Sequence, residues 1–447
     1  MARVGELSPD VPVVSICRGP LPQNLSRKVD SWEEFLSKGA KTDSNMKAPV
    51  GFGDTATLRY SSGTTGKPKG AVFNHSNLRY MAESTVSITD WRARNHAGSY
   101  LSFLPMGHVV EGILATYSPY FIPAPIDIYF LEDFRKLQKA LPQVKLVLFF
   151  SVPRIYEKIW EGLEANPFGR FYVSRKKGFL RRLLRQTVRS MTLRRAGLNK
   201  CAQLIAGSAS SDENLLQNFR ELGVEIHDAY GMTEAPLVTL NRVGRNRLGT
   251  VGEPMPMTQV KTAEDGEIMV KGPQVTVGYL DKTLESPFKD GWLMTGDIGK
   301  ITEECSLVIF GRKKELIKTS YGKCIYSGKI EGMLRELPGV TEAMLVGESK
   351  PYCSALLWVD KKQFDDKTAK AIDTAVEEMN NNLSHPEKVK KWAILANTLS
   401  IEKGDLTPNL KLKRNVVSQR FAKTVDAFYG GERPKDEAIY GSSEKED

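Results

Sequence analysis

The residues most able to do chemistry lie in one short loop, Tyr60–Gly70, which reads YSSGTTGKPKG. Glycines let the backbone approach an anion closely and expose N–H groups to it. Ser and Thr hydroxyls donate to phosphate oxygens, and lysines add charge-assisted hydrogen bonds. The loop therefore predicts a polyphosphate site, whose candidate ligands are Ser61, Ser62, Gly63, Thr64, Thr65, Gly66, Lys67, Lys69 and Gly70.

This loop does not fit the G-x-x-x-x-G-K-[ST] pattern of the P-loop nucleotidases. Ser61 stands where that pattern requires the first glycine, and Pro68 replaces the Ser or Thr that would bind magnesium. Taken alone, the loop could equally be a flexible Ser/Gly turn without a ligand. The choice between these interpretations depends on segments further along the chain.

Four later segments carry residue types that suit a nucleotide. Leu204–Ala209 predicts a strand ending in a small-residue turn that accepts a flat ring. Asp228–Glu234 offers an aromatic ring, a hydroxyl and a hard carboxylate for magnesium. Trp292–Asp297 places a carboxylate after a tight turn, where it can accept ribose hydroxyls, and Leu406–Arg414 is a basic loop. Each segment alone has an ordinary explanation as a turn, a helix cap or a solvated surface.

The elements that must position these residues alternate between strand and helix patterns, which is typical of a layered α/β fold. Apolar runs predict strands at 146–150, 203–206, 224–227, 267–270, 275–279 and 307–310. Apolar periodicity and caps predict helices at 31–38, 133–141, 153–163, 180–193 and 213–222.

The punctuation of the sequence predicts how these elements divide into domains. Gly- and Pro-rich sequence from 244 to 299 predicts a small β-rich module, and the charged run Arg312–Glu315 precedes a smaller α+β region. We therefore predict a large α/β domain over 1–311, a small α+β domain over 312–430 and a polar tail over 431–447.

Composition limits the class of protein. None of the 447 residues lies in an uninterrupted apolar stretch long enough to span a bilayer, and the first residues lack the apolar core of a signal peptide. Five scattered cysteines without a C-x-x-C pair argue against a structural zinc site. We expect a protein that is not secreted and lies in the cytoplasm, either free or peripherally on a membrane.

The net charge of +10 is concentrated in one stretch, because eleven basic and no acidic residues lie between Ala165 and Ser211. Within it, Phe179–Arg195 predicts a basic amphipathic helix. Such a helix can lie on an anionic membrane. Alternatively, its apolar face packs on the domain and its arginines are solvated. Nucleic-acid binding is disfavoured, because no aromatic or base-reading module accompanies the charge.

In this order, the loop and the four segments resemble the adenylate-forming superfamily of acyl-CoA synthetases, acyl ligases, luciferases and nonribosomal adenylation domains. The resemblance covers roughly residues 55–420. It is most specific at Ser62–Gly70, Tyr230–Glu234, Gly291–Asp297 and Gly311–Lys318. The segments Phe103–Glu111, Gly311–Lys318 and Leu406–Arg414 are similar to the long-chain fatty acyl-CoA synthetase branch.

That resemblance implies ATP- and Mg²⁺-dependent activation of a long-chain fatty acid to acyl-AMP, followed by transfer to CoA. It implies that the Tyr60–Gly70 loop holds the β- and γ-phosphates and that a mobile small domain follows the large one. It assigns adenine to Gly207, Ser208, Ala209 and Tyr230, the ribose to Asp297 and Arg312, and the α-phosphate to Thr233. It assigns magnesium to Glu234 and Thr65, the acyl carboxylate to His108, and adenylation to Lys411. It assigns the hinge to Lys314 and further nucleotide contacts to Asp228, Gly231 and Lys318.

Two departures from the family pattern stand beside this match. Only about sixty residues precede the loop, so the resemblance implies that part of the N-terminal lobe is missing. Ser327-Gly328 replaces a Pro-Glu type pair in the segment that shapes the CoA-bound pose.

Two alternative functions remain open. One is an acyl-AMP ligase that delivers to a carrier protein, although the short passage from Asp297 to Lys318 lacks the insertion of that branch. The other is an inactive or split fragment that acts as a membrane-associated binding protein.

Overall fold

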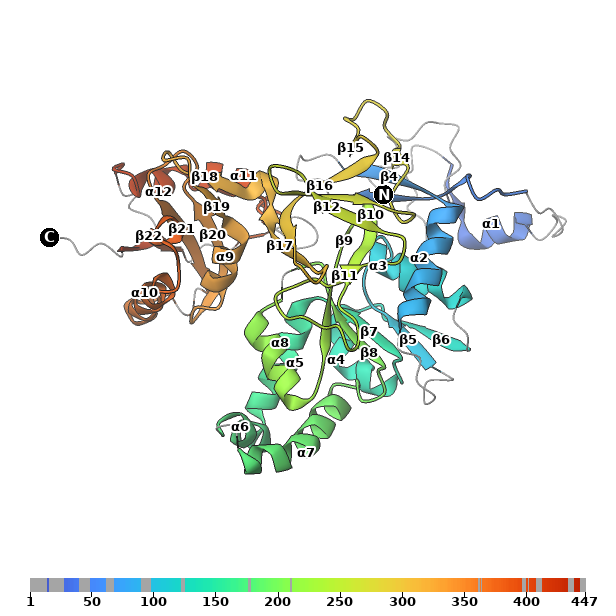
Figure 1. The fold of residues 1–447 in the computed structure, drawn as a ribbon, viewed down its shortest axis with the longest axis horizontal. Helices are drawn as coiled ribbons and strands as arrows, with labels where there is room; N and C mark the ends of the chain where they lie inside the picture. The colour runs from blue at the N-terminus through green and yellow to red at the C-terminus, as the bar shows by residue number, and fades with distance from the viewer. Residues whose placement is uncertain are drawn as a thin grey trace. The chain divides into compact units, whose positions relative to one another are not determined.

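The computed structural model describes residues 14–15, 28–39, 49–61, 68–89, 98–121, 125–175, 178–209, 211–360, 362, 364–395, 399–400, 402–406, 412–432 and 438–442. The chain divides into two compact units, Met1–Gly51 and Phe52–Asp447. Figure 1 shows the elements of both, coloured along the chain.

The first unit contains one helix, α1 (Trp32–Gly39), and a short parallel pair of strands, β1 (Val14–Ser15) and β2 (Asp30–Ser31), within its described residues. The helix begins where Ser31 and Glu34 exchange hydrogen bonds, the backbone N–H of each donating to the side chain of the other. This reciprocal pair satisfies two of the N–H groups that a helix start leaves without partners. The predicted helix at 31–38 is thereby confirmed.

A five-stranded sheet with the order β11-β10-β9-β8-β7 forms the centre of the second unit. β7, β8 and β9 run parallel, and β10 and β11 are antiparallel to their neighbours. The strands are β7 (Leu148–Ser151), β8 (Gln203–Ala206), β9 (Ile226–Met232), β10 (Ala235–Leu240) and β11 (Glu253–Pro254).

Helices connect the parallel strands, as an α/β fold requires. They are α5 (Pro153–Ala165), α6 (Pro167–Val173), α7 (Phe179–Arg195) and α8 (Glu213–Leu222). Buried side chains of α5, α7 and α8, among them Trp160, Val188 and Phe219, share one hydrophobic core with the sheet. The local signals for α8 are complete, since Asp212 caps its start and Gly223 ends it with a φ of 83°.

The N-terminal part of this unit contributes two smaller groups of strands. β3 (Thr55–Ser61) and β4 (Lys69–Asn74) form an antiparallel hairpin that β14 (Gly278–Tyr279) extends. β5 (Gly98–Ser102) and β6 (Ile126–Phe130) form a parallel pair. The accompanying helices are α2 (His75–Ile88), α3 (Val109–Glu111), a π-helix at Gly112–Tyr117, α4 (Leu137–Ala140) and 3₁₀ turns at Ser118–Tyr120, Phe134–Lys136 and Leu141–Gln143.

The predicted β-rich module is a sheet with the order β12-β13-β16-β15, to which β17 is added through β16. Its strands are β12 (Gln259–Thr262), β13 (Glu267–Lys271), β15 (Phe288–Lys289), β16 (Trp292–Ile301) and β17 (Leu307–Arg312). Two predicted elements differ from the structure. Of the strand expected at 275–279, only the last two residues form a strand, β14. The helix expected at 133–141 is interrupted, with α4 lying between two 3₁₀ turns.

The C-terminal part begins with a 3₁₀ turn at Lys313–Glu315 and a hairpin of β18 (Leu316–Lys318) and β19 (Cys324–Tyr326). A four-stranded sheet follows, with the order β20-β21-β22-β23. Its elements are β20 (Val340–Val346), β21 (Cys353–Val359), β22 (Val389–Leu395), β23 (Ala438–Ser442), α9 (Ser327–Arg335), α10 (Asp366–Asn380), a 3₁₀ turn at His385–Glu387, α11 (Arg414–Arg420) and α12 (Ala422–Ala427).

The fold is thus a mixed α/β fold, as predicted. Across the residues that the structure describes, no helix combines the length and the apolar composition needed to cross a bilayer.

One buried ion pair in the C-terminal part gives a direct test of its packing. Asp405 is fully buried and binds Arg420, with 2.6 Å between the carboxylate Oδ2 and the guanidinium Nη1. We expect Arg420→Ala to lower the free energy of unfolding by about 3 kcal/mol, because removing the guanidinium leaves the buried Asp405 carboxylate without its ion-pair partner. Urea unfolding measures the change. Glu342→Ala, which breaks the more exposed pair with Arg335, is the control and costs at most about 1 kcal/mol. Equal losses in both variants would contradict this account.

Candidate active site

The predicted phosphate loop joins the two strands of a hairpin. Ser61 pairs with Lys69 and Tyr60 with Gly70 across β3 and β4. A Cβ on Gly70 would lie 3.1 Å from the exposed Tyr60 ring, so glycine lets the two strand ends pair without displacing this ring. Ser61, Lys69 and Gly70 therefore lie at the two ends of the loop, and the predicted ligands between them, Ser62, Gly63, Thr64, Thr65, Gly66 and Lys67, lie outside the described residues.

A tyrosine links this hairpin to the predicted magnesium ligand. The Tyr279 hydroxyl donates to Glu234 Oε1 at 2.9 Å, and the Lys69 ammonium lies 5.1 Å from the centre of the Tyr279 ring. Burial, with the nearby Glu234 carboxylate, raises the pKa of Tyr279, which keeps its hydroxyl a donor. Glu234 is buried, and Thr233 lies half-buried beside it in the turn between β9 and β10. No feature of the sequence indicated this role for Tyr279.

Tyr230, Asp297 and Arg312, which the sequence places far apart, meet in the structure. The Tyr230 hydroxyl donates to Asp297 Oδ2 at 2.5 Å, and Arg312 Nε lies 2.9 Å from Asp297 Oδ1. Asp297 and Arg312 face each other across β16 and β17. Burial, with the Asp297 carboxylate, raises the pKa of Tyr230, so this hydroxyl remains protonated. Gly231 follows at a point where a Cβ would meet the Leu237 backbone nitrogen at 2.4 Å.

The small-residue turn after β8 lies beside β9, because Ala206 pairs with Asp228. A Cβ on Gly207 would lie 2.9 Å from the Phe150 ring and 3.2 Å from the Ala229 carbonyl oxygen. The turn formed by Gly207, Ser208 and Ala209 is thus narrow. It lies at the carboxyl ends of the parallel strands, which is the usual place for a ligand in an open α/β sheet.

Asp228 has an unusual environment. Ser211 Oγ donates to Asp228 Oδ1 at 2.5 Å. Burial nevertheless raises the pKa of Asp228 to about 6, because desolvation outweighs this hydrogen bond.

His108 approaches the same turn from another segment. The N–H of Val110 donates to His108 Nδ1 at 3.3 Å, which assigns the ring proton to Nε2. His108 Nε2 lies 3.4 Å from Ser208 Oγ. Behind it, Glu111 is fully buried and accepts a hydrogen bond from Tyr100 at 3.0 Å, and burial raises the pKa of Glu111. The Nε2–H of His108 thus faces the Gly207–Ala209 turn, where it can donate a hydrogen bond.

Arg59, which sequence reasoning missed, connects the hairpin to the segment that carries His108. Its guanidinium donates to the Met106 carbonyl at 2.7 Å and to the Tyr117 hydroxyl at 2.5 Å. Tyr117 ends the π-helix, and the Arg59 guanidinium carbon lies 5.6 Å from the centre of its ring. Arginine within a strand usually indicates a solvated edge, so composition alone could not identify this contact.

The residues after Arg312 begin the C-terminal part. The Lys313 ammonium binds Asp265 at 2.6 Å and Glu267 at 2.7 Å, and these carboxylates raise the pKa of Lys313. The other oxygen of Glu267 accepts the N–H of Gly296 at 2.9 Å, one residue before Asp297. Lys314 and Lys318 are exposed. Lys411 lies outside the described residues, although the bridge between Leu406 and Leu412 closes its loop.

The chemistry of this donor set fits a nucleotide. The arrangement provides narrow glycine turns, a buried tyrosine, and a carboxylate–guanidinium pair that can exchange its contacts for ribose hydroxyls. A buried carboxylate beside the hairpin that is predicted to bind phosphate suits Mg²⁺, which is often held by one or two carboxylates together with substrate phosphates. Glu234 has this position.

Comparison with known proteins agrees with this geometry. Residues 10–280 match the family described as AMP-binding enzyme, and residues 314–433 match the AMP-binding enzyme C-terminal domain. The chain is 31% identical over 480 residues to the long-chain-fatty-acid–CoA ligase FadD15 of Mycobacterium bovis, which covers 96% of this chain and 78% of that protein. It is 30% identical to the ligase ACSBG2 of Gallus gallus, covering 89% of this chain and 62% of that one.

Solved structures show the same fold. O-succinylbenzoate coenzyme A synthetase from Bacillus subtilis, in complex with AMP, superposes with a TM-score of 0.66 at 22% identity, covering 87% of this chain and 74% of that one. MatB from Rhodopseudomonas palustris, bound to ATP, gives a TM-score of 0.67 at 22% identity, covering 89% and 75%.

The raised pKa of Asp228 predicts a pH-dependent stability. The carboxyl binds its proton more tightly in the folded chain, with a pKa of about 6 against 3.8, so stability falls as pH rises between these values. We expect Asp228→Asn to remove this fall. The variant then matches the wild type near pH 4 and exceeds it at pH 7.5 by up to about 3 kcal/mol.

Urea unfolding at the two pH values measures this difference, with the exposed Asp360→Asn as the control. A stability difference that does not change with pH would contradict the role of burial.

Proposed function

We propose a function from one established premise, that the chain belongs to the AMP-binding enzyme family. This membership confirms the predicted superfamily. The proposed reaction activates a long-chain fatty acid with ATP and transfers the acyl group to CoA, giving acyl-CoA, AMP and pyrophosphate. The observation that carries the proposal is the 31% identity to a long-chain-fatty-acid–CoA ligase over 96% of the chain.

The chemistry of the first step explains the residue types in the site. A fatty acid carboxylate is already ionised and needs no general base. Its oxygen attacks the α-phosphorus of ATP, a new P–O bond forms, and the bond to the β-phosphate oxygen breaks to release pyrophosphate. Catalysis therefore consists of bringing two anions together and neutralising the charge that develops.

In the proposed assignment, the Tyr60–Gly70 loop holds the β- and γ-phosphates. The base lies in the Gly207–Ala209 turn beside Tyr230, with Asp228, Gly231 and Lys318 as further nucleotide contacts. Asp297 and Arg312 hold the ribose, and their mutual distance of 2.9 Å supports this role. Thr233 contacts the α-phosphate, and His108 Nε2 faces the acyl carboxylate. Lys411 reaches the α-phosphate from the small domain.

Glu234, together with Thr65, would hold Mg²⁺, which neutralises phosphate charge when it is bound. Tyr279 orients the Glu234 carboxylate by donating to one of its oxygens.

The second step, attack of the CoA thiolate on acyl-AMP with release of AMP, requires a different pose of the small domain. We place the pivot at Lys314 and the domain boundary after residue 311. The distribution of hydrophobic cores supports this division. Leu307 and Ile309 pack with the large domain, whereas Ile317 and Ile325 pack with the strands of the C-terminal sheet.

CoA as the acceptor is favoured over a carrier protein by the direct passage from β17 into the Lys313–Glu315 turn and β18, which leaves no room for an insertion. A cytoplasmic location is part of the proposal. It is supported by the absence of a disulfide at the four described cysteines, Cys201, Cys305, Cys324 and Cys353.

ATP–pyrophosphate exchange by the purified chain, with fatty acids of graded length, tests the first step. Exchange that depends on the acid supports the proposal, and its length profile identifies the substrate class. Formation of acyl-CoA from free CoA then distinguishes a CoA ligase from a carrier-protein ligase. A folded chain that binds no ATP and catalyses no exchange would refute the enzymatic proposal.

Lys411→Ala tests the lysine assigned to adenylation. We expect the exchange rate to fall by roughly 10²–10³, the usual cost of removing one electrostatic donor from a transition state. Lys423→Ala changes an exposed lysine on α12 and serves as the charge-matched control. Exchange near the wild-type rate in Lys411→Ala would remove this residue from the mechanism.

Tyr279→Phe tests the orientation of Glu234. Losing the hydroxyl donor leaves the carboxylate less well positioned, so we expect half-maximal exchange to require about tenfold more Mg²⁺. Titration of Mg²⁺ at saturating ATP measures this shift. Tyr129→Phe, at a half-exposed position on β6, provides the control. An unchanged Mg²⁺ requirement with a lower maximal rate would assign Tyr279 a role other than metal positioning.

A further inference from the structure

The basic stretch identified in the sequence forms an unusual surface at α6 and α7. The apolar residues of α7 divide between two faces. Val188 is fully buried in the main core, with Leu184 and Met191 packed against that core. Phe179, Leu180 and Leu183 instead have exposed fractions of 84%, 44% and 64%. Phe179 and Leu183 are four residues apart, so they project from the same side of the helix, opposite Val188.

Arginines flank this exposed apolar side. Arg182 is exposed, and within the described part of the chain it forms no ion pair with a carboxylate. Arg175, two residues after the end of α6, lies over the ring of exposed Phe171, with 4.4 Å from the guanidinium carbon to the ring centre. We call the surface made by Phe171, Arg175, Phe179, Arg182 and Leu183 the α6–α7 face.

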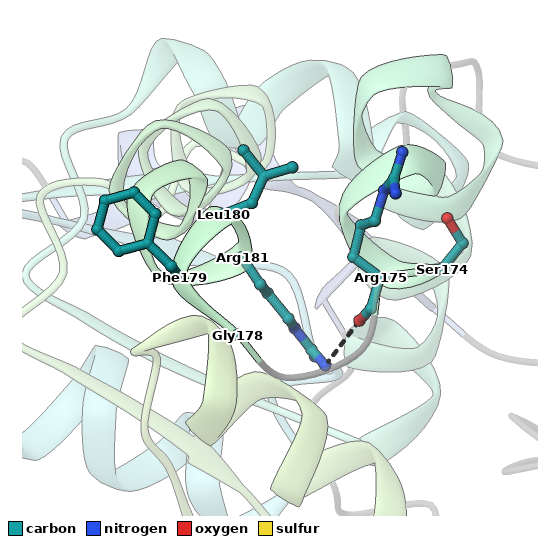
Figure 2. Close-up of a pocket in the computed structure, with 6 residues that line it drawn as sticks. All are labelled: Ser174, Arg175, Gly178, Phe179, Leu180 and Arg181. Atoms are coloured by element: carbon teal, nitrogen blue, oxygen red, sulfur yellow. Dashed lines mark hydrogen bonds between the residues drawn. The ribbon is translucent and has the colours of Figure 1, made fainter.

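Not every arginine of the stretch is available for a partner. Arg181 points inward, where its guanidinium lies 3.1 Å from the Glu221 carboxylate and 5.1 Å from the centre of the Tyr172 ring. Figure 2 shows the hollow between the ends of α6 and α7, with Phe179 and Leu180 on one side and Ser174 and Arg175 on the other. Arg181 spans it by donating to the Arg175 carbonyl at 3.4 Å. Arg181 thus holds the two helix ends together.

Two features of this face are unfavourable in water. Large apolar side chains are exposed at the start of α7, where insertion into an apolar phase would stabilise them. Arg181 and Arg182 stand in the first turn of α7, which has no acidic residue, although the positive end of the helix dipole disfavours cations there. An anionic surface with an apolar interior offsets both costs.

We propose that the α6–α7 face docks the protein on an anionic lipid bilayer. Phe179 and Leu183 enter the interface between headgroups and acyl chains, and Arg175 and Arg182 bind lipid phosphates beside them. Apolar residues at the outermost positions of the helix, flanked by arginines, are the pattern of a helix that lies in the plane of a membrane. A single-stranded nucleic acid would contact the same arginines, but it would not require the exposed leucine. This docking surface is independent of the nucleotide site.

Co-sedimentation with vesicles tests the proposal on the full chain. We expect binding to vesicles of phosphatidylcholine mixed with phosphatidylglycerol and not to phosphatidylcholine alone, and we expect high salt to weaken it. Arg175→Gln with Arg182→Gln should weaken binding about 25-fold, since each basic residue near an anionic surface contributes about fivefold. Phe179→Ser with Leu183→Ser should weaken binding at least tenfold at any salt concentration.

Matched controls separate the face from general charge and hydrophobicity. Lys367→Gln with Lys370→Gln removes two exposed charges on α10, and Met257→Ser removes an apolar side chain that is 78% exposed. Both controls should bind like the wild type, and thermal melting should show that every variant is folded.

Three results would overturn the proposal. They are no binding to anionic vesicles at low salt, unchanged binding in both sets of α6–α7 face variants, and tighter binding to a single-stranded RNA than to anionic vesicles. ATP–pyrophosphate exchange without vesicles should be unaffected by these variants, so failure of docking and failure of the proposed reaction are distinguishable.

Discussion

The arrangement of the site depends on one buried carboxylate. Asp297 accepts the Tyr230 hydroxyl from β9 and pairs with the Arg312 guanidinium from β17. β9 belongs to the central sheet and β17 to the β-rich module, so this contact joins two different sheets. A carboxylate that is only 4% exposed is unstable without such partners, at a cost of roughly 3–5 kcal/mol. The need to satisfy this charge therefore holds the two sheets at a fixed distance.

The fold and the candidate residues could be predicted where their signals are local. The predicted bounds of β8 and α8 match the structure, because a short apolar strand and a helix with both caps are encoded by adjacent residues. The motif residues could be listed from the sequence for the same reason, because each motif is a run of adjacent residues. The contact between Tyr279 and Glu234 spans 45 positions, and that between Arg59 and Tyr117 spans 58. Sequence spacing carries no information about such distant partners.

The basic helix α7 is a second case in which the sequence does not predict which distant residues a side chain contacts. Periodicity indicates which side chains share a face, and the sequence left open whether the apolar face of α7 packs inward or meets a membrane. Both descriptions apply to different residues of the helix, since Val188 lies in the core while Phe179 is exposed. The difference depends on which sides of α7 other elements of the fold cover. No local pattern encodes where a neighbouring helix stops.

The contacts of Lys313 constrain how the C-terminal part can turn. Its ammonium is held by Asp265 and Glu267, and Glu267 also fixes the N–H of Gly296 beside Asp297. In mechanical terms, the chain up to Lys313 is a fixed mount, because these contacts tie it to the segment that carries Asp297. A rotation at Lys314, the proposed pivot, would then be confined to a few backbone dihedrals, and the Asp297–Arg312 pair, the proposed ribose site, would stay in place while the C-terminal part moves.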